Sequence, residues 1–287
     1  KQKFIARLQG EPKLSDKGIA LKLPRMAFEI TSIDYDSTAK LNKQIRDAYA
    51  HPTDSYKRQY LRTYAPYNVG FQLSILAKNM DEGLQIDSTV AYLWQQKAMP
   101  YFKARKYEVG MKYRDKAVFY NPDRWLSYRA FIKCIFSKTY KAAIVDFEKC
   151  IETQGNSYVM DHTFNFHIAL SYLQLNEFEK SEKIFSIDIE NQKKEWGEAH
   201  FLDLFYLGIS KYEQGKWEEA ITEFDNSLQQ YPNFSDVEFY KTICLKRLGR
   251  VEEAKKLIKK AKKDGLMGNT ISEDNAIYEI YPYQVRW

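Results

Sequence analysis

Histidine and cysteine are the side chains that proteins use most often to bind transition metals and to act as nucleophiles. This chain of 287 residues contains four histidines and three cysteines. His162 and His167 are five residues apart, so they do not share a helical face as paired metal ligands at i and i+4 would. Cys134, Cys150 and Cys244 show no CxxC spacing, and an odd number does not make a complete disulfide framework. We therefore expect no metal site and no cofactor.

Other catalytic motifs are also missing from the sequence. It has no phosphate-binding P-loop, no dinucleotide-binding glycine pattern and no GxSxG elbow. The acidic pairs at 218–219 and 252–253 lie at the starts of expected helices, where carboxylates interact favourably with the helix dipole. The sequence therefore predicts a non-enzymatic protein with no catalytic residues. One alternative stays open, which is an enzyme with its active site within residues 1–90.

The composition is that of a folded protein with an ordinary core. Hydrophobic residues make up 44% of the chain and charged residues 29%, which argues against wholesale disorder. The net charge of +6 arises from 44 basic and 38 acidic residues, which are too evenly mixed to indicate a nucleic-acid partner. No stretch reaches the roughly 18 consecutive apolar residues of a membrane-spanning helix.

The elements that would position any functional residue come from an internal repeat. Counted from Phe201, the chain has Gly at position 8, Trp at 17, Ala at 20, Phe at 24 and Pro at 32. A related pattern recurs in units that begin at Ala91, Arg124, His162 and Ser235. Position 20 is small in every unit, where it is Gly110, Ala143, Ser181, Ala220 and Ala254. Small side chains there would let two antiparallel helices approach each other closely.

These residues resemble the tetratricopeptide repeat family, whose unit of about 34 residues is a helix-turn-helix hairpin. The resemblance covers about residues 91–268 and implies an all-α fold, an α-solenoid in which stacked hairpins share a continuous core. In the first unit Arg114 replaces an aromatic residue, and Pro100 is expected to kink the leading helix or end it early. The connections "TQGNSYVMD" and "NQKKEWGEA" are expected to extend helices or loops between units.

We expect three regions along the chain. Residues 1–90 form a non-repeat extended arm and helical cap, residues 91–268 form the tetratricopeptide repeat array, and residues 269–287 form an aromatic C-terminal tail. The tail has two interpretations. It either folds over the last repeat as a cap, or it is a peptide-like segment that docks on a partner or occupies the array's own groove.

The resemblance also implies where a partner would bind. In this family the first helix of each unit lines a concave surface that binds peptides or helices, and here that surface is aromatic in the middle and basic at one end. The partner-binding candidates are Tyr92, Trp125, Tyr128, Phe136, Phe166, Phe205, Tyr212, Lys246 and Arg247. The same set of positions includes Glu213, Asp236 and Phe239. Aromatic side chains bury large areas at low entropic cost, which suits binding. The alternative is that some of them belong to the core or are covered by the N-terminal arm.

The sequence thus predicts a scaffold or adaptor subunit that holds one or more protein partners in a multi-subunit complex. The opening "KQKF" without an initiating methionine, and the family's use in bacterial envelope complexes, favour a periplasmic or outer-membrane-associated lipoprotein. Such a protein would associate peripherally with the membrane through a removed or lipidated N-terminus. A cytoplasmic adaptor is the alternative.

Overall fold

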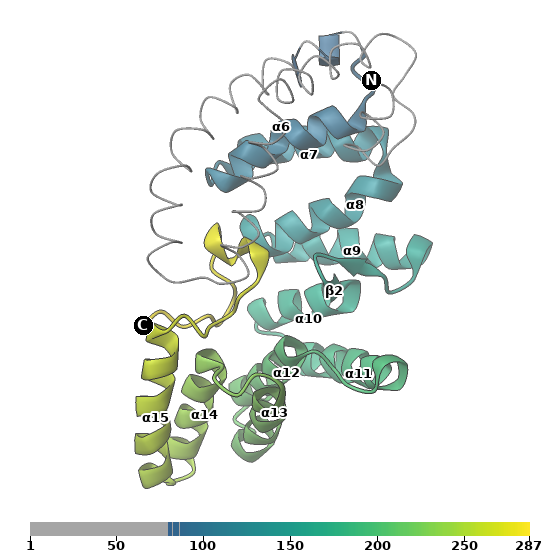
Figure 1. Ribbon diagram of the computed structural model, residues 1–287. Coiled ribbons are helices and arrows are strands. Elements are labelled where there is room, and N and C mark those ends of the chain that lie inside the picture. Colours follow the sequence, from purple (N-terminus) through teal and green to yellow (C-terminus); the bar gives the residue numbers. More distant parts are fainter. Residues whose placement is uncertain (1–79, 82, 86) are drawn as a thin grey trace, which may run out of the picture. The chain divides into compact units, whose positions relative to one another are not determined.

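The computed structural model describes residues 80, 81, 83–85 and 87–287. The expected arm and most of the expected cap lie outside these residues. The organisation of residues 1–79 therefore stays a prediction. The described part is mainly helical, with one short two-stranded hairpin, and the expected all-α solenoid is confirmed (Figure 1).

The chain divides into two compact units, and the described part of the first contains one helix pair. This pair consists of α6 (Ala91–Lys103) and α7 (Tyr107–Tyr120). Gly110 on α7 faces Phe102 on α6 so closely that a Cβ atom at residue 110 would lie 2.6 Å from the ring. The helix α6 runs through Pro100 to Lys103, so the expectation that it ends early is wrong. Proline removes one backbone hydrogen bond, but its fixed φ angle is helical.

The second unit contains residues 105–107 and 122–287. Four helical hairpins follow one another in it, and each helix packs against its neighbours along the chain (Figure 1). Their helices are α8 (Pro122–Phe131), continued by the π-helix η1 (Ile132–Phe136), α9 (Tyr140–Gln154), α10 (Phe164–Gln174), α11 (Phe178–Trp196), α12 (Phe201–Glu213), α13 (Trp217–Gln230), α14 (Ser235–Arg247) and α15 (Val251–Leu266).

The small residues at position 20 all lie buried on the second helix of their hairpins. The joint between α12 and α13 shows why. Gly208 lies against the ring of Phe224, and a Cβ atom at residue 208 would come within 2.5 Å of that ring. Ala220 on the facing helix is fully buried. The two helices can therefore approach this closely only where their side chains are absent or small.

The turn inside each hairpin contains one residue in the left-handed region. The φ angles are 58° at Arg105, 55° at Lys138, 61° at Asn176, 75° at Gly215 and 75° at Gly249. All five residues occupy position 15 when counted from the unit starts at 91, 124, 162, 201 and 235. Glycine adopts this conformation freely and asparagine tolerates it, whereas arginine and lysine do so at a cost of about 1 kcal/mol. The backbone therefore repeats in the register that the sequence indicated.

The two longer connections between units take different forms. The first contains the antiparallel hairpin of β1 (Tyr158–Val159) and β2 (His162–Thr163). The second lengthens α11 to Trp196, after which Gly197 ends the helix with a φ angle of 83°. A glycine in the left-handed conformation is a common helix terminator.

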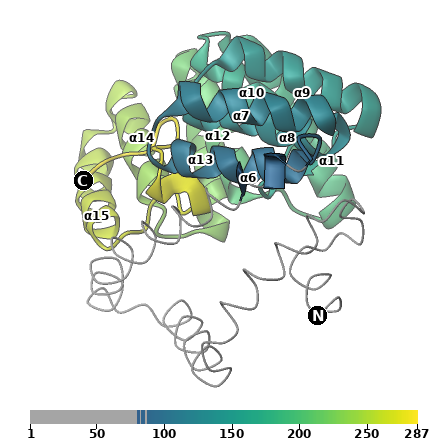
Figure 2. The same cartoon turned by 90° about the horizontal axis from the view of Figure 1, so that it is seen from above.

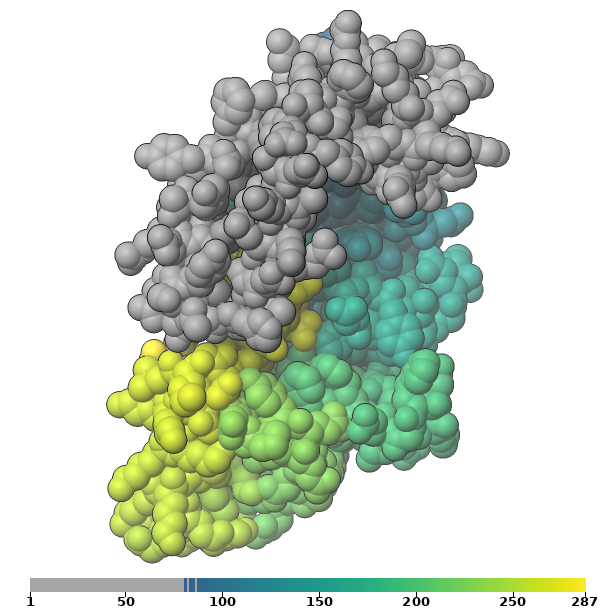
Figure 3. Space-filling view, viewed as in Figure 1, coloured from purple at the N-terminus to yellow at the C-terminus, as the bar shows by residue number. Residues whose placement is uncertain are grey.

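The chain turns back after α15 instead of continuing the solenoid. Gly268 has a φ angle of 86°, and the Ser235 amide donates a hydrogen bond to the Asn269 carbonyl at 2.9 Å. Both ribbon views show the tail, with its short 3-10 helix η2 (Asp274–Ile277), lying across the second unit (Figures 1 and 2). The space-filling view shows α14 and α15 at one end of that unit (Figure 3).

Candidate functional site

Asp236, in the first turn of α14, is the polar anchor of the tail. Its side chain is fully buried. Oδ2 accepts hydrogen bonds from the Thr270 hydroxyl at 2.6 Å and the Ile271 amide at 3.0 Å, and Oδ1 accepts one from the Val285 amide at 2.5 Å. Burial raises the pKa of Asp236, against the effect of these hydrogen bonds. One carboxylate therefore joins α14 to both ends of the tail.

Aromatic residues hold the second half of the tail. The Tyr206 hydroxyl on α12 donates a hydrogen bond to a tail carbonyl at 3.0 Å, and the tail residue Tyr283 donates its hydroxyl to Glu213 at 2.9 Å. Trp287 meets the ring of Phe239 edge to face at a centroid distance of 5.8 Å. Glu213, Asp236 and Phe239 are groove positions of the last two repeats. The tail thus contacts three positions that the family pattern assigns to the concave surface.

Glu279 in the tail is held by cations from the turns of two hairpins. Its carboxylate lies 3.5 Å from Arg105 Nε and 3.3 Å from Lys138 Nζ, and it accepts a hydrogen bond from the Tyr107 hydroxyl. Arg105 also donates to the Tyr278 carbonyl at 3.0 Å. Burial, followed by the hydrogen bond and the charge of Glu279, raises the pKa of Tyr107 to about 12. The left-handed residues Arg105 and Lys138 therefore supply the positive charge that the tail carboxylate meets.

The structure places the nine partner-binding candidates in different environments. The candidates buried in the core are Trp125, Phe136, Phe166 and Phe205. Those that are partly or fully exposed are Tyr92, Tyr128, Tyr212, Lys246 and Arg247. Phe166 packs against Phe185 and Tyr206, and Phe205 packs against Phe224. A partner would reach the buried side chains only if the array rearranged, and their role in binding stays a prediction.

A second cluster of functional side chains begins at the β-hairpin before α10. Val159 on β1 pairs with His162 on β2, and Met160 and Asp161 between them have φ angles of 49° and 65°. Two consecutive left-handed residues form the tight turn that suits the twist of a hairpin, although neither residue here is glycine. This turn directs the chain into β2, where the His162 side chain is buried.

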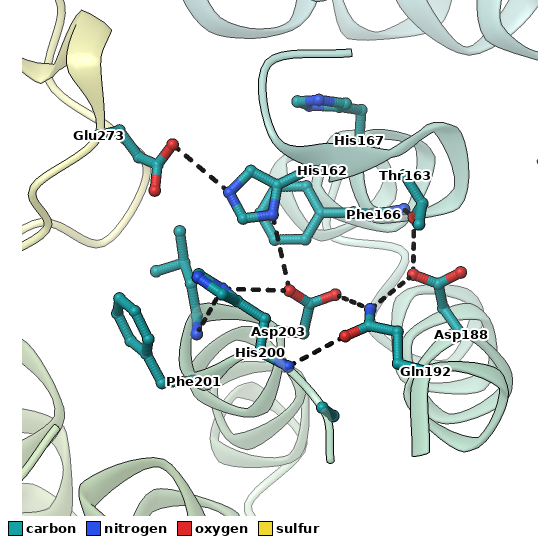
Figure 4. A network of polar contacts seen from close by, with 12 residues as sticks. His162, Thr163, Phe166, His167, Asp188, Gln192, His200, Phe201, Asp203 and Glu273 are labelled. Atoms are coloured by element: carbon teal, nitrogen blue, oxygen red, sulfur yellow. Dashed lines mark hydrogen bonds and ion pairs between the residues drawn. The ribbon is translucent and has the colours of Figure 1, made fainter. Parts of the chain in front are cut away.

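His162 meets His200 and Asp203 at the start of α12 (Figure 4). Asp203 Oδ2 lies 3.6 Å from His162 Nδ1 and 3.7 Å from His200 Nδ1. One ligand atom from each of the three side chains lies within 4.8 Å of the other two. Glu273 in the tail approaches the other side of the His162 ring, with Oε2 3.4 Å from Nε2. Side chains from three separate parts of the second unit therefore converge on one point.

Gln192 on α11 orients this cluster. Its Nε2 donates to Asp203 Oδ1 at 2.7 Å and to Asp188 Oδ2 at 3.2 Å, and its Oε1 accepts from the His200 amide at 3.0 Å. The Thr163 hydroxyl donates to Asp188 at 2.6 Å. The other oxygen of Asp203, Oδ2, is buried, has no hydrogen-bond partner and faces the two histidines (Figure 4).

Burial and the charges in the cluster together shift the pKa values of His162 and His167 in opposite directions. Burial lowers the pKa of His162, but the nearby carboxylates of Asp203 and Glu273 outweigh it, so the pKa rises to about 9. Burial, together with the charge on His162, lowers the pKa of His167 to about 3. The structure thus favours a cationic His162 between two carboxylates and a neutral His167.

A cleft of about 310 Å³ opens beside the cluster. Besides the cluster itself, its lining includes Tyr158, Asp161, Trp196, Glu198 and Gln230. The His200 side chain is 44% exposed, whereas that of Asp203 is 1% exposed. The cleft therefore gives solvent a route to the buried carboxylate.

Sequence reasoning missed this cluster because it compared His162 only with His167. The one local signal was the spacing of His200 and Asp203, since residues three apart share a face of a helix. The approach of His162 depends on the hairpin, and that of Glu273 depends on the path of the tail. Neither is visible in local sequence periodicity.

The stacked helical hairpins define the class of protein as an α-solenoid, and comparison with known proteins identifies the repeat. Residues 211–265 match the tetratricopeptide repeat family. PilW, a widely conserved type IV pilus biogenesis factor, has a similar fold, with a TM-score of 0.54 and 14% identity over 70% of this chain and 86% of its own. MamA from Desulfovibrio magneticus RS-1, from residue 41 to its end, gives a TM-score of 0.52 and 11% identity over 62% of this chain and 96% of its own. The repeat is therefore of the tetratricopeptide type, and the resemblance seen in the sequence is confirmed.

The N-terminal region is similar to a different family. Residues 1–96 match the tail sheath stabiliser of T4-like Myoviridae viruses. Most of this range lies outside the described residues; the described part includes Met80 and Leu84, which pack against Leu93 of α6. No curated protein sequence matches the chain. Among the described residues, no helix combines the length and the apolar character needed to cross a membrane.

Proposed function

We propose that this chain is a non-enzymatic scaffold whose repeat array binds a protein segment on the face that its own tail covers. The observation that carries the proposal is the way the tail is held. Asp236 accepts hydrogen bonds from backbone amides of the tail, aromatic side chains lie against α12 and α14, and two cations face Glu279. Main-chain hydrogen bonds supply affinity in peptide recognition, and side-chain contacts supply selectivity.

The contacts of the tail also indicate the chemistry of the partner. A competing segment needs an acidic residue opposite Arg105 and Lys138 and aromatic residues at the places of Tyr283 and Trp287. The tethered tail acts at a local concentration on the order of millimolar. A partner therefore binds only if its affinity and concentration are high enough to compete with the tail at this effective concentration.

Fluorescence anisotropy with a labelled peptide of residues 269–287 tests this function. The full chain carrying Glu279→Ala and Tyr283→Ala has a weakened tail but an intact array, because both substitutions lie in the tail. We expect it to bind the peptide at least about tenfold more tightly than the unsubstituted chain does, since intramolecular competition is reduced.

The matched control is a peptide that itself carries Glu279→Ala and Tyr283→Ala. It should bind the weakened-tail chain poorly, because it cannot meet Arg105, Lys138 or Glu213. If circular dichroism shows a folded variant and yet neither peptide binds, the array is not a peptide-binding surface and the proposed function is wrong.

Two settings are candidates for this scaffold. The match of residues 1–96 to a viral tail sheath stabiliser favours a multi-subunit contractile tail, in which the repeats would hold another tail component. The fold shared with a pilus biogenesis factor is the support for a cell-envelope complex with peripheral membrane association. We favour the contractile tail, because a sequence-family match over 96 residues is more specific than a shared fold at 14% identity.

Immunogold labelling in the native source distinguishes the two settings. An antibody raised against the full chain should label purified contractile tails and leave washed envelope fractions unlabelled. Label confined to envelope fractions would reverse the preference. An enzymatic role for residues 1–90 stays the remaining alternative, and it predicts an activity that survives the loss of peptide binding.

A further inference from the structure

The cluster at the start of α12 presents three ligand atoms of the types that hold transition metals. They come from His162, His200 and Asp203, and the contacts of 3.6 Å and 3.7 Å point to the two Nδ1 atoms and to Asp203 Oδ2. In the part of the chain that the structure describes, no other group of histidine, cysteine and acidic side chains converges in this way. The residues come from a β-hairpin and from the first turn of a helix, so their positions are fixed by regular backbone.

We propose that His162, His200 and Asp203 form a binding site for a divalent transition metal ion, with Zn²⁺ as the best fit. Zn²⁺ lies about 2.0–2.2 Å from nitrogen and oxygen ligands in tetrahedral sites, which places two such ligands about 3.4 Å apart. The Asp203 oxygen is 3.6 Å and 3.7 Å from the two imidazole nitrogens. Small side-chain rotations are enough to bring the three atoms to bonding distance.

The contacts behind the ligands support this assignment. Gln192 occupies Oδ1 of Asp203 and leaves Oδ2 buried and without a hydrogen-bond partner. Glu273 lies behind the His162 ring, 3.4 Å from Nε2, so it can hold the Nε2 proton when a metal ion displaces the proton from Nδ1. A carboxylate behind a histidine, and a hydrogen-bond donor behind a ligating carboxylate, are the outer contacts that orient metal ligands in proteins.

The ligand set and the cleft decide which ion fits. Two imidazoles and one carboxylate suit Zn²⁺ and its neighbours in the transition series, whereas Mg²⁺ and Ca²⁺ prefer oxygen ligands alone. The exposed edge of His200 and the adjoining cleft provide a path for the ion and space for a water molecule as the fourth ligand. His200 Nδ1 also accepts a long hydrogen bond of 3.3 Å from the Leu202 amide, which metal binding would replace.

Zn²⁺ titration of the full chain, purified without a histidine tag, tests the proposal. Competition with a chromophoric chelator should give one ion per chain. Asp203→Asn and His200→Ala should each weaken binding at least about tenfold, and Glu273→Gln, which changes only the contact behind His162, should weaken it about tenfold. Co²⁺ in place of Zn²⁺ should give the visible absorption of a low-coordinate ion, which a nonspecific surface site does not produce.

Asp161→Asn is the matched control. It removes an exposed carboxylate from the same cleft, its asparagine tolerates the φ angle of 65°, and it leaves the three ligands in place, so Zn²⁺ affinity should not change. Thermal unfolding of each variant without metal verifies that it folds. Absence of stoichiometric binding by the unsubstituted chain would overturn the proposal, and so would equal affinity in the folded Asp203→Asn variant. The Zn²⁺ stoichiometry and the affinity of the Asp203→Asn variant can both be measured whether or not the array binds peptides.

Discussion

Two contact regions of the second unit hold the chain together by different physical means. At the joint of α12 and α13, Gly208 of α12 lies against Phe224 of α13, and Ala220 of α13 is fully buried, so apolar side chains pack closely. Where the tail meets the array, Asp236 and Glu279 form hydrogen bonds and ion pairs. Water can replace polar contacts, but it cannot fill a close-packed joint. We therefore expect the helix joints to act as a permanent frame and the tail to be the segment that can be released.

The largest effect is expected from overfilling the joint. Gly208→Leu adds a side chain where even a Cβ atom would lie 2.5 Å from the Phe224 ring. We expect the free energy of unfolding to fall by about 3 kcal/mol or more, because neither helix can move without disturbing the next hairpin. Urea denaturation followed by circular dichroism measures this change. An unchanged midpoint would show that the joint is not close-packed.

A smaller loss is expected at the joint of α8 and α9, which contains a charge. Asp146 is buried and accepts hydrogen bonds from Arg129 at 2.7 and 2.8 Å and from Lys133 at 2.7 Å. Asp146→Ala leaves two neighbouring cations without their carboxylate and should cost about 2 kcal/mol, since both cations keep partial access to water. Glu148→Ala, on the exposed side of the same helix, is the control for the urea midpoint. Equal effects of the two substitutions would remove the role assigned to the buried ion pair.

Releasing the tail should change its dynamics more than the stability of the array. Asp236→Ala removes the acceptor of three hydrogen bonds from the tail. Amide hydrogen exchange in residues 270–285 should become about 10–100 times faster, whereas the unfolding midpoint of the array should change little. A large fall in array stability would mean that the tail is part of the frame, and the comparison would fail.

The smallest effect is expected at the end of the tail. A Cβ atom at Gly265 would lie 2.0 Å from the ring of Trp287, so Gly265→Ala should displace that ring. Trypsin should then cleave after Arg286 more quickly, as mass spectrometry can measure. Because alanine favours a helix by up to about 1 kcal/mol over glycine, the array should not lose stability. Gly208→Ala is the matched variant, and it should destabilise the array while the tail stays protected.

The repeat architecture could be predicted because its causes are local. Small residues at position 20 and a turn after position 14 act within one hairpin, and hairpins of similar sequence stack in similar ways. Arg105 and Lys138 show that the register is set by the whole unit, because they take the left-handed conformation where other repeats have Gly or Asn.

The candidate sites could be predicted only in part, because they depend on contacts between distant segments. The family pattern assigned Phe166 and Phe205 to a binding surface, but their rings lie in the core of this array. The sequence offered a tail that caps or a tail that fills a groove, and nothing local distinguishes the two. The approach of Glu273 to His162 joins residues that are far apart in the chain, and it depends on the path of that tail.

The left-handed residue at position 15 has a consequence for how such an array changes its selectivity during evolution. Equivalent positions of stacked repeats lie along one edge of the solenoid, and in two repeats this position supplies the cations that meet Glu279. Asn176, Gly215 and Gly249 are uncharged at the same place. On the proposed peptide-binding function, single substitutions along this edge would alter which acidic peptides the surface accepts, while every buried contact between helices stays as it is.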